Sequence, residues 1–234
     1  GILIENCSIN YCGDRTETPT IFKATTEDGR VNAKNVKIKD CTINIEQCAP
    51  TLVIFMCSEG SVINFEVNNC LINTELEIAN VFYRIPSVLN NTVYLKKCSG
   101  EIFFKCNQVE NTSVTTTENS KISNQGIFKN NNFNLTTSQD SILFNITGYL
   151  ELYNNNINIS NSSYRTIFYY NDSSNMDIKL INNSFNNVGI AFVSNGRVII
   201  GGNDFLNFTK NAIQGSTVLQ YANIVNNVYK PDSF

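Results

Sequence analysis

A nine-residue motif recurs along the chain and constrains its fold more than any other feature. It consists of an apolar residue, any residue, an apolar residue, any residue, a small or polar residue, Cys or Asn, any residue, an apolar residue and usually Asn. Internal repetition at about 20–35 residues is typical of solenoids, in which each repeat packs mainly against its neighbours. The copies lie at residues 2–10, 36–44, 65–73, 93–101, 126–134, 150–158, 178–186, 198–206 and 222–230.

The spacing of apolar residues within the motif predicts two short strands joined by a sharp corner. Positions one and three alternate with variable residues, as Ile2 and Ile4 do, which is the period of a strand. Position eight is apolar again, but it lies five residues after position three. A continuous strand would place these two side chains on opposite faces, so a turn must intervene at positions five and six. Position five is mostly Asn, Asp or Gly, which adopt left-handed backbone geometry at low cost. The residues at position five are Asn6, Asp40, Asn69, Lys97, Asn130, Asn154, Asn182, Gly202 and Asn226.

Position six changes from Cys to Asn along the chain. In coils stacked about 4.8 Å apart, equivalent side chains form a column. Asn amides in such a column can donate to one another, and Cys is small enough to be buried there. The predicted ladder consists of Cys7, Cys41, Cys70, Cys98, Asn131, Asn155, Asn183, Asn203 and Asn227.

A third strand precedes most copies of the motif, and its last residue is Phe. The connection from this strand to the next motif varies in length and often contains Gly. We expect the six phenylalanines to stack in the core, and we expect residues 107–125 to form a protruding loop. The predicted third strands are 20–22, 53–55, 80–82, 142–144, 166–168 and 190–192.

Three short strands per coil predict an all-β fold, a parallel β-helix solenoid of about nine coils that forms one elongated domain over residues 1–234. We expect a right-handed helix, since three-strand coils with variable loops are commonly right-handed. A leucine-rich repeat lacks support because no helical periodicity lies between the strands. A β-sandwich lacks support because no Asn-Gly hairpin signals are present.

The apolar-x-x-Asn spacing resembles a known repeat. It occurs at Phe128–Asn131, Leu152–Asn155, Leu180–Asn183, Ile200–Asn203 and Ile224–Asn227. It is similar to the Phe-x-x-Asn repeats of polymorphic outer-membrane protein-like right-handed β-helices, which are surface adhesins. The coils also resemble those of pectate lyases and related polysaccharide-acting proteins. The resemblance implies a β-helix, with adhesion or polysaccharide chemistry as its expected functions.

The cysteines allow two interpretations. All eight lie in the first 106 residues, and Cys12, Cys48, Cys57 and Cys106 fall outside the predicted ladder. A disulfide such as Cys12–Cys48 could join adjacent coils, or the thiols could fill the core. A zinc ribbon is not expected because no CxxC pair occurs, and a catalytic Cys is disfavoured because the chain has no histidine. We therefore expect no metal and no cofactor.

The other candidates for chemistry are sparse. Arg165 with Asp172 and Asp177 could form a lyase-like arrangement of an Arg base and Ca²⁺-binding acids, or only a solvated turn. Of the adjacent Tyr169 and Tyr170, one is expected to face solvent, where it could stack on a sugar or be ordinary surface. An ice-binding face would need regular Thr arrays, and Thr is scattered outside the motif.

The composition narrows the partners and the location. The net charge is only −3 and no basic cluster is present, which disfavours nucleic-acid binding. No apolar run approaches the roughly 18–20 residues that a membrane span needs. Asn-x-Ser/Thr sequons favour a secreted glycoprotein. Sequons also occur at Asn6 and Asn182, but we expect glycosylation among Asn90, Asn111, Asn134, Asn145, Asn158, Asn161, Asn171 and Asn207.

These observations favour a non-enzymatic structural or adhesive protein, extracellular or at the cell surface, as a coat or filament component. The chain begins within a repeat, at Gly1-Ile2-Leu3-Ile4, as expected of a mature protein or of a segment of a longer rod. Open strand edges at the ends would favour head-to-tail self-association, with other surface proteins or glycans as further partners. The alternative is a polysaccharide lyase or glycoside hydrolase on the same scaffold.

Overall fold

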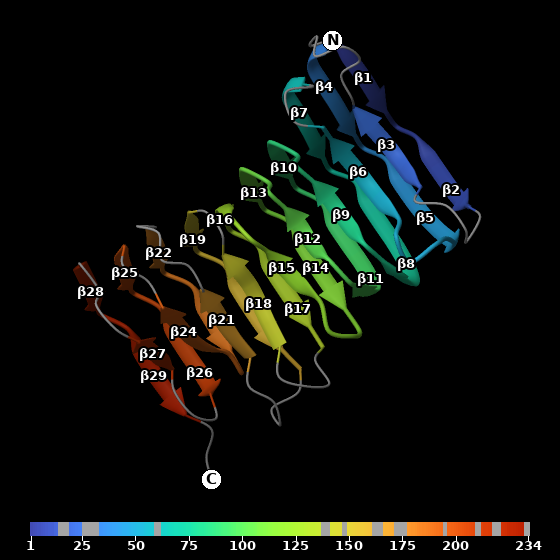
Figure 1. The fold of residues 1–234 in the computed structure, drawn as a ribbon. Helices are drawn as coiled ribbons and strands as arrows, with labels where there is room; N and C mark the ends of the chain where they lie inside the picture. Colours follow the sequence, from blue (N-terminus) through green and yellow to red (C-terminus); the bar gives the residue numbers. More distant parts are fainter. Residues whose placement is uncertain are drawn as a thin grey trace.

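The structure is a computed structural model, and all of its regular elements are β-strands (Figure 1). It describes residues 1–13, 19–24, 33–58, 62–136, 141–146, 149–160, 166–170, 177–193, 196–208, 212–216 and 221–231. Every strand pairing in this part of the chain is parallel, and the strands form three sheets. The predicted all-β parallel β-helix is therefore confirmed.

Each sheet takes every third strand of the chain. The first sheet contains β1 Ile2–Glu5, β4 Ala33–Lys39, β7 Val62–Asn68, β10 Ser87–Leu89, β13 Gln108–Glu110, β16 Gly126–Lys129, β19 Leu150–Tyr153, β22 Ile178–Ile181, β25 Arg197–Gly201 and β28 Tyr221–Val225. The second contains β2 Ser8–Cys12, β5 Thr42–Gln47, β8 Leu71–Ile78, β11 Thr92–Cys98, β14 Ser113–Thr116, β17 Asn132–Leu135, β20 Asn156–Ile159, β23 Ser184–Asn186, β26 Asp204–Phe208 and β29 Val228–Pro231. The third contains β3 Thr20–Ala24, β6 Val53–Cys57, β9 Asn80–Tyr83, β12 Glu101–Phe104, β15 Lys121–Ser123, β18 Ser141–Ile146, β21 Thr166–Tyr170, β24 Gly189–Val193 and β27 Ile213–Ser216.

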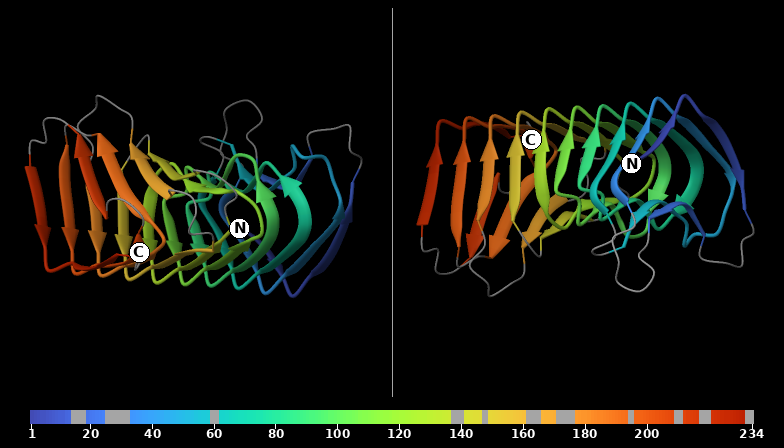
Figure 2. Two further views of the ribbon diagram at one scale, coloured as in Figure 1. Left: turned by 90° about the horizontal axis from the view of Figure 1, so that it is seen from below. Right: turned by 90° about the horizontal axis from the view of Figure 1, so that it is seen from above.

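One strand from each sheet makes a coil, and the coils stack in sequence order into a rod (Figure 2). The first and second sheets each have 10 strands, so the stack contains ten coils where the repeat count predicted about nine. Register between neighbouring coils is regular. Asn132, Phe133, Asn134 and Leu135 of β17, for example, pair one for one with Asn156 to Ile159 of β20.

The difference in coil number comes from the middle of the chain. Two copies of the motif, at 86–94 and 107–115, begin with Pro86 and Asn107 in place of an apolar residue. The copy assigned at 93–101 instead spans β11 and the corner that leads into β12. The stretch 107–125 contains β13, β14 and β15, which form a complete coil. The prediction of a protruding loop there is therefore wrong.

The corner between the first and second sheets has one left-handed residue in every coil. The predicted positive φ is confirmed at all assigned positions except Lys97, which lies within β11. Asn90 and Asn111 supply this geometry in the two coils that were not recognised. The residues and their φ values are Asn6 54°, Asp40 54°, Asn69 52°, Asn90 56°, Asn111 50°, Asn130 56°, Asn154 55°, Asn182 55°, Gly202 66° and Asn226 55°.

The core consists of columns of equivalent inward side chains. Position three of the motif forms the column of the first sheet, and position eight forms that of the second. In the interior coils these side chains are almost completely buried. The first column is Ile4, Ile38, Val67, Val88, Val109, Phe128, Leu152, Leu180, Ile200 and Ile224. The second is Ile9, Ile43, Ile72, Val93, Val114, Phe133, Ile157, Phe185, Phe205 and Tyr229.

A phenylalanine stack forms the core column of the third sheet. The rings of Phe22, Phe55, Phe82 and Phe103 are nearly parallel, and successive centroids lie 5.3 Å apart. Ser123 occupies the next position, where a ring is missing. Phe128 of the first sheet packs there edge-on between Phe103 and Phe144, at 5.7 Å from each. An aromatic ring from a neighbouring strand thus replaces the missing one.

All six predicted third strands are confirmed, as parts of β3, β6, β9, β18, β21 and β24. The predicted stacking is confirmed for Phe22, Phe55 and Phe82. The side chains of Phe168, Phe192, Tyr169 and Tyr170 lie outside the part of the structure that is described. The expectations for them stay predictions.

Candidate functional site

The inner ladder lies directly after the left-handed corner of each coil. The assignments at Cys7, Cys41, Cys70 and at the five Asn positions are confirmed, whereas Cys98 lies at a different corner. Asn91 and Thr112 fill the two places that the motif did not reveal. Along the stack the ladder is Cys7, Cys41, Cys70, Asn91, Thr112, Asn131, Asn155, Asn183, Asn203 and Asn227.

Each Asn of the ladder closes the corner of the coil before it. Asn155 Oδ1 accepts the backbone N–H of Asn131 at 3.0 Å and its side-chain N–H at 2.9 Å. Asn155 Nδ2 donates to the carbonyl of Phe128 at 2.9 Å and to Asn183 Oδ1 at 3.0 Å. The same pattern recurs at Asn183, Asn203 and Asn227. The ladder therefore satisfies buried backbone groups that the tight corner leaves outside the strand pairing.

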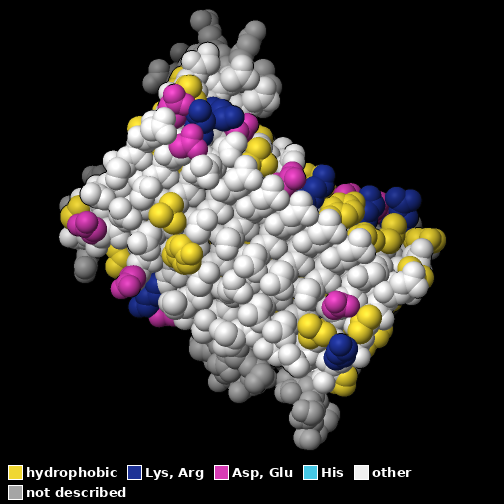
Figure 3. Space-filling model, turned by 180° about the vertical axis from the view of Figure 1, so that it is seen from behind, with side chains coloured by type: hydrophobic (Ala, Val, Ile, Leu, Met, Phe, Trp, Pro, Cys, Tyr) yellow, Lys and Arg dark blue, Asp and Glu magenta, His cyan; other side chains and the backbone are white. Residues whose placement is uncertain are grey.

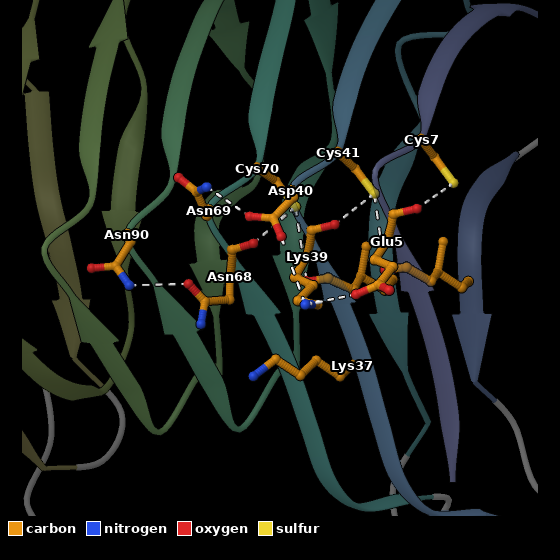
Figure 4. Close-up of polar contacts among 12 residues, drawn as sticks. Glu5, Cys7, Lys37, Lys39, Asp40, Cys41, Asn68, Asn69, Cys70 and Asn90 are labelled. Carbon is orange, nitrogen blue, oxygen red and sulfur yellow. Dashed lines mark hydrogen bonds and ion pairs between the residues drawn. The ribbon is translucent and has the colours of Figure 1, made fainter.

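The cysteine part of the ladder contacts mainly carbonyls of its own coil. Cys41 Sγ donates to the carbonyl of Lys39 at 3.1 Å, and Cys70 Sγ donates to that of Asn68 at 3.4 Å. Longer contacts lead to the preceding coil, from Cys41 to the carbonyl of Ile4 at 4.0 Å and from Cys70 to that of Ile38 at 3.8 Å. Figure 4 shows the three thiols in successive coils. Cys and Asn thus occupy the same position of successive coils, and the cross-coil amide hydrogen bonds belong to the Asn residues.

Cys98 occupies the corner between the second and third sheets. Its backbone N–H donates to Ser120 Oγ at 2.9 Å, and its thiol donates to the carbonyl of Ala79 at 3.0 Å. Its assignment to the inner ladder is wrong because alternating Val93 and Leu95 imitate the start of the motif.

All eight cysteines are reduced thiols in the structure, which confirms the buried-thiol interpretation for six of them. The proposed Cys12–Cys48 disulfide is absent. Cys12 pairs in register with Gln47 and donates to its Oε1 at 3.7 Å, while Cys48 Sγ donates to the carbonyl of Glu77 at 3.9 Å.

Burial makes two core thiols, those of Cys106 and Cys70, poor acids and couples stability to alkaline pH. Burial is the main cause that raises the pKa of Cys106 to about 12 and that of Cys70 to about 11, from the ordinary value of 9.0. The folded state therefore holds these protons more tightly than the unfolded state. Its stability is complete below about pH 9 and falls between about pH 9 and 12, by up to about 1.4 kcal/mol per pH unit for each thiol.

We expect urea unfolding to give a lower free energy at about pH 10.5 than at about pH 8, by roughly 2 kcal/mol or more. Cys106→Ala is the internal control, because removing this thiol is expected to make the pH dependence shallower. If the variant and the natural protein lost stability equally over this range, the buried Cys106 thiol would not be its source.

The outward faces of the first and second sheets differ in charge. The first sheet carries ion pairs between successive coils. Lys39 Nζ lies 2.6 Å from Glu5, Lys37 Nζ lies 2.8 Å from Glu66, and Lys179 Nζ lies 2.9 Å from Glu151. The Lys39–Glu5 pair is visible beside the thiols in Figure 4. Such exposed pairs contribute about 0–1 kcal/mol each, so they are a surface feature more than a source of stability.

The outward face of the second sheet is a polar surface with few charges. From β2 to β23, all but two of the residues in its two main columns are Ser, Thr or Asn; the exceptions are Leu71 and Tyr94. Figure 3 shows the side of the molecule opposite to Figure 1, with a broad field of uncharged polar side chains and backbone. The columns are Ser8, Thr42, Leu71, Thr92, Ser113, Asn132, Asn156 and Ser184, and Asn10, Asn44, Asn73, Tyr94, Thr115, Asn134, Asn158 and Asn186.

Outer Asn ladders organise part of this surface. Asn186 Nδ2 donates to Asn158 Oδ1 at 2.7 Å, and Asn158 Nδ2 donates to Asn134 Oδ1 at 3.5 Å. Near the other end, Asn44 Nδ2 donates to Asn10 Oδ1 at 3.0 Å. The uncharged face is therefore held in order by contacts that repeat from coil to coil.

A hollow of about 530 Å³ lies on this face over β8, β11 and β14. It surrounds the exposed Tyr94, which interrupts the Asn, Ser and Thr column. Between Leu95 and Lys97 the register of β11 with β8 shifts, because β8 has one residue more at this point. Such bulges re-aim side chains. The lining residues are Asn73, Thr74, Glu75, Tyr94, Leu95, Lys96, Thr115 and Thr117.

One residue of the sequence does indicate this hollow, because it departs from the motif. Tyr94 is position nine of the unrecognised copy at 86–94, where most copies have Asn. The extra residue of β8 is not visible in the sequence, because Glu75, Leu76, Glu77 and Ile78 alternate polar and apolar residues as a regular strand does.

The predicted glycosylation sites fall into three groups. Asn90, Asn111 and Asn207 are exposed and have positive φ, the first two at corners and Asn207 within β26. Asn134 and Asn158 point outward from the second sheet, as predicted, but are half-buried. Asn161 and Asn171 lie outside the described residues, and so does the side chain of Asn145.

The candidate lyase-like arrangement is not assembled in the described part of the chain. Arg165 and Asp172 lie outside it. Asp177 is described, and its carboxylate lies 3.2 Å from Arg197 of the next coil.

Among the described residues, no group of three or more His, Cys, Asp or Glu side chains is arranged to hold a metal ion. The same residues contain no helix with the length and apolar character needed to cross a membrane. No family model, no curated protein and no solved structure matches the chain.

Proposed function

We propose that the chain is a non-enzymatic structural and adhesive rod of the cell surface or extracellular space, carries N-glycans and belongs to a coat or filament. The observation that carries this proposal is that its buried and its outward polar side chains have different roles. The buried Asn residues satisfy the corners of the coils, and the outward Asn, Ser and Thr residues of the second sheet form a polar face with few charges. Uncharged hydrogen-bonding groups suit contact with glycans and other neutral surfaces.

The resemblance to polymorphic outer-membrane protein-like adhesins supports the adhesive part of the proposal. The phrase Phe128-Lys129-Asn130-Asn131 lies at a corner where Asn130 has positive φ and Asn131 belongs to the inner ladder. The repeat therefore performs a structural task in this chain. A rigid stack of this kind holds a surface away from its point of attachment without any catalytic group.

The last coil offers a surface on which a further coil can stack. Ile224 and Tyr229 belong to columns that are buried in the interior coils, yet they are 43% and 46% exposed in this coil. A further coil, from a longer chain or from a second copy, would cover these apolar side chains and pair the open strand edges.

The experiment is glycopeptide mapping of the protein from its native source, together with its localisation by surface labelling of intact cells. We expect glycans at exposed sites such as Asn90, Asn111 and Asn207. Glycosylation replaces only one of the two amide N–H groups, so Asn90 can keep its hydrogen bond to Asn68 Oδ1 at 3.0 Å. Protein that is unmodified and inaccessible at the cell surface would contradict the proposal.

A further inference from the structure

We propose that the hollow around Tyr94 is a binding site for a neutral saccharide. The inference rests on the proposed function in one respect, since an adhesive rod gives such a site its purpose.

Tyr94 provides a stacking surface at a place where the repeat does not require one. Its side chain is 47% exposed, and its register neighbours in the adjacent coils are Asn73 and Thr115. The other residues of this column, from β2 to β23, are Asn or Thr, so the fold does not require an aromatic ring at this position. The face of an aromatic ring is electron-rich, and it attracts the polarised C–H bonds of a sugar ring.

The bulge in β8 adds a carboxylate to the same hollow. Thr74 lies inward and fixes the bulge, because its Oγ1 donates to the carbonyl of Ile45 at 3.1 Å and accepts the backbone N–H of Leu76 at 3.1 Å. The following residue, Glu75, is exposed and lines the hollow. Carboxylates form strong hydrogen bonds with hydroxyl donors, so Glu75 suits a polyhydroxylated ligand.

The charges around the hollow disfavour an anionic ligand. Besides Glu75, the charged lining residue is Lys96, whose Nζ lies 3.3 Å from the Glu118 carboxylate. The remaining polar groups are the amide of Asn73 and the hydroxyls of Thr115 and Thr117. Because Lys96 is paired with Glu118, Glu75 leaves the lining with one negative charge, which repels anions and accepts hydrogen bonds from hydroxyl groups. A neutral saccharide finds donors, acceptors and an aromatic ring here.

The dimensions of the hollow are adequate for a short oligosaccharide. Its volume of about 530 Å³ lies within the roughly 300–1,000 Å³ of small-molecule sites. It extends across three strands, and neighbouring strands are about 4.8 Å apart. We therefore expect two or three sugar units to lie across β8, β11 and β14.

The test is an NMR or calorimetric titration of the purified chain with chitotriose, cellotriose and mannotriose. We expect saturable binding of at least one of these probes in the micromolar to millimolar range. Tyr94→Thr is expected to weaken it about tenfold or more, because Thr retains strand propensity but not the ring. Glu75→Gln is expected to weaken it severalfold, because the amide keeps the shape without the charge.

Tyr149→Thr is the matched control, since Tyr149 is another exposed tyrosine and lies outside the hollow. It is expected to bind as the natural protein does. Absence of saturable binding by all three probes would overturn the site, as would unchanged binding by Tyr94→Thr. Either result would leave surface localisation and glycosylation to be judged by their own experiment.

Discussion

Asn155→Ala is expected to lower the free energy of unfolding by about 3–5 kcal/mol, because it leaves buried backbone groups without partners. The backbone N–H of Asn131 loses its acceptor, and the carbonyl of Phe128 loses its donor. Two further amide contacts, with the side chains of Asn131 and Asn183, are lost at the same time. Urea or guanidinium unfolding followed by circular dichroism measures this effect.

Asn156→Ala is the matched control for this prediction. Asn156 is the next residue, but its side chain is exposed and donates only to Asn132 Oδ1 at 3.0 Å. We expect its removal to cost less than about 1 kcal/mol. If both alanine variants were equally stable, the inner ladder would not be a main source of stability.

The ladder can also be tested in the opposite direction at Thr112. Its Oγ1 donates to the backbone carbonyl of Glu110 in its own coil at 3.1 Å and accepts the backbone N–H of Asn91 at a long 3.4 Å. Thr112→Asn would place an amide between the amides of Asn91 and Asn131, where it can reach the preceding coil as the other ladder residues do. A gain of about 1 kcal/mol is therefore expected in the same unfolding experiment.

The success of the motif shows which features of this fold are local. A left-handed corner needs Asn, Asp or Gly within a few residues, and the next side chain must satisfy the corner. Both requirements are visible in a short stretch such as Asn130-Asn131, so the corners, the ladder and the two sheets beside them could be predicted. The third strands could be predicted because their phenylalanines recur in the same place.

The failures occurred where a coil meets the same requirements with different residues. In β10 and β13 only three residues pair as a strand, so position one lies outside the strand. Pro86 and Asn107 are therefore acceptable there, and the motif looks broken. The hollow at Tyr94 could not be predicted from the sequence for a related reason. It depends on one extra residue in β8 relative to β11, and relative register across coils is a three-dimensional property that alternation within one strand does not reveal.

Phe82→Ala is expected to destabilise the protein by about 3–5 kcal/mol, because it opens a cavity in the middle of the phenylalanine stack. Phe82 is completely buried, and its ring lies 5.3 Å from those of Phe55 and Phe103. Neither neighbour can move into the space easily, since each is held in its own coil by strand pairing. Equilibrium unfolding measures the loss.

Tyr83→Ala separates the core contribution of Phe82 from a general effect of changing β9. Tyr83 is the next residue of the same strand, is only half-buried and stacks on Phe104 at 4.5 Å. Its removal is expected to cost about 1 kcal/mol, in keeping with one partly exposed aromatic pair. An equal loss in the two variants would show that the phenylalanine stack has no special weight.

The position of the damage is as informative as its size. In a solenoid each coil is supported mainly by its neighbours, so a cavity at Phe82 acts first on the coils next to it. Hydrogen exchange of Phe82→Ala is therefore expected to show faster exchange in β6, β9 and β12 than in the natural protein, with β22 and β25 nearly unchanged. Equal acceleration in all ten coils would mean that the stack unfolds as one cooperative unit. In that case the inner ladder, which runs the full length of the rod, would be the structure that couples the coils.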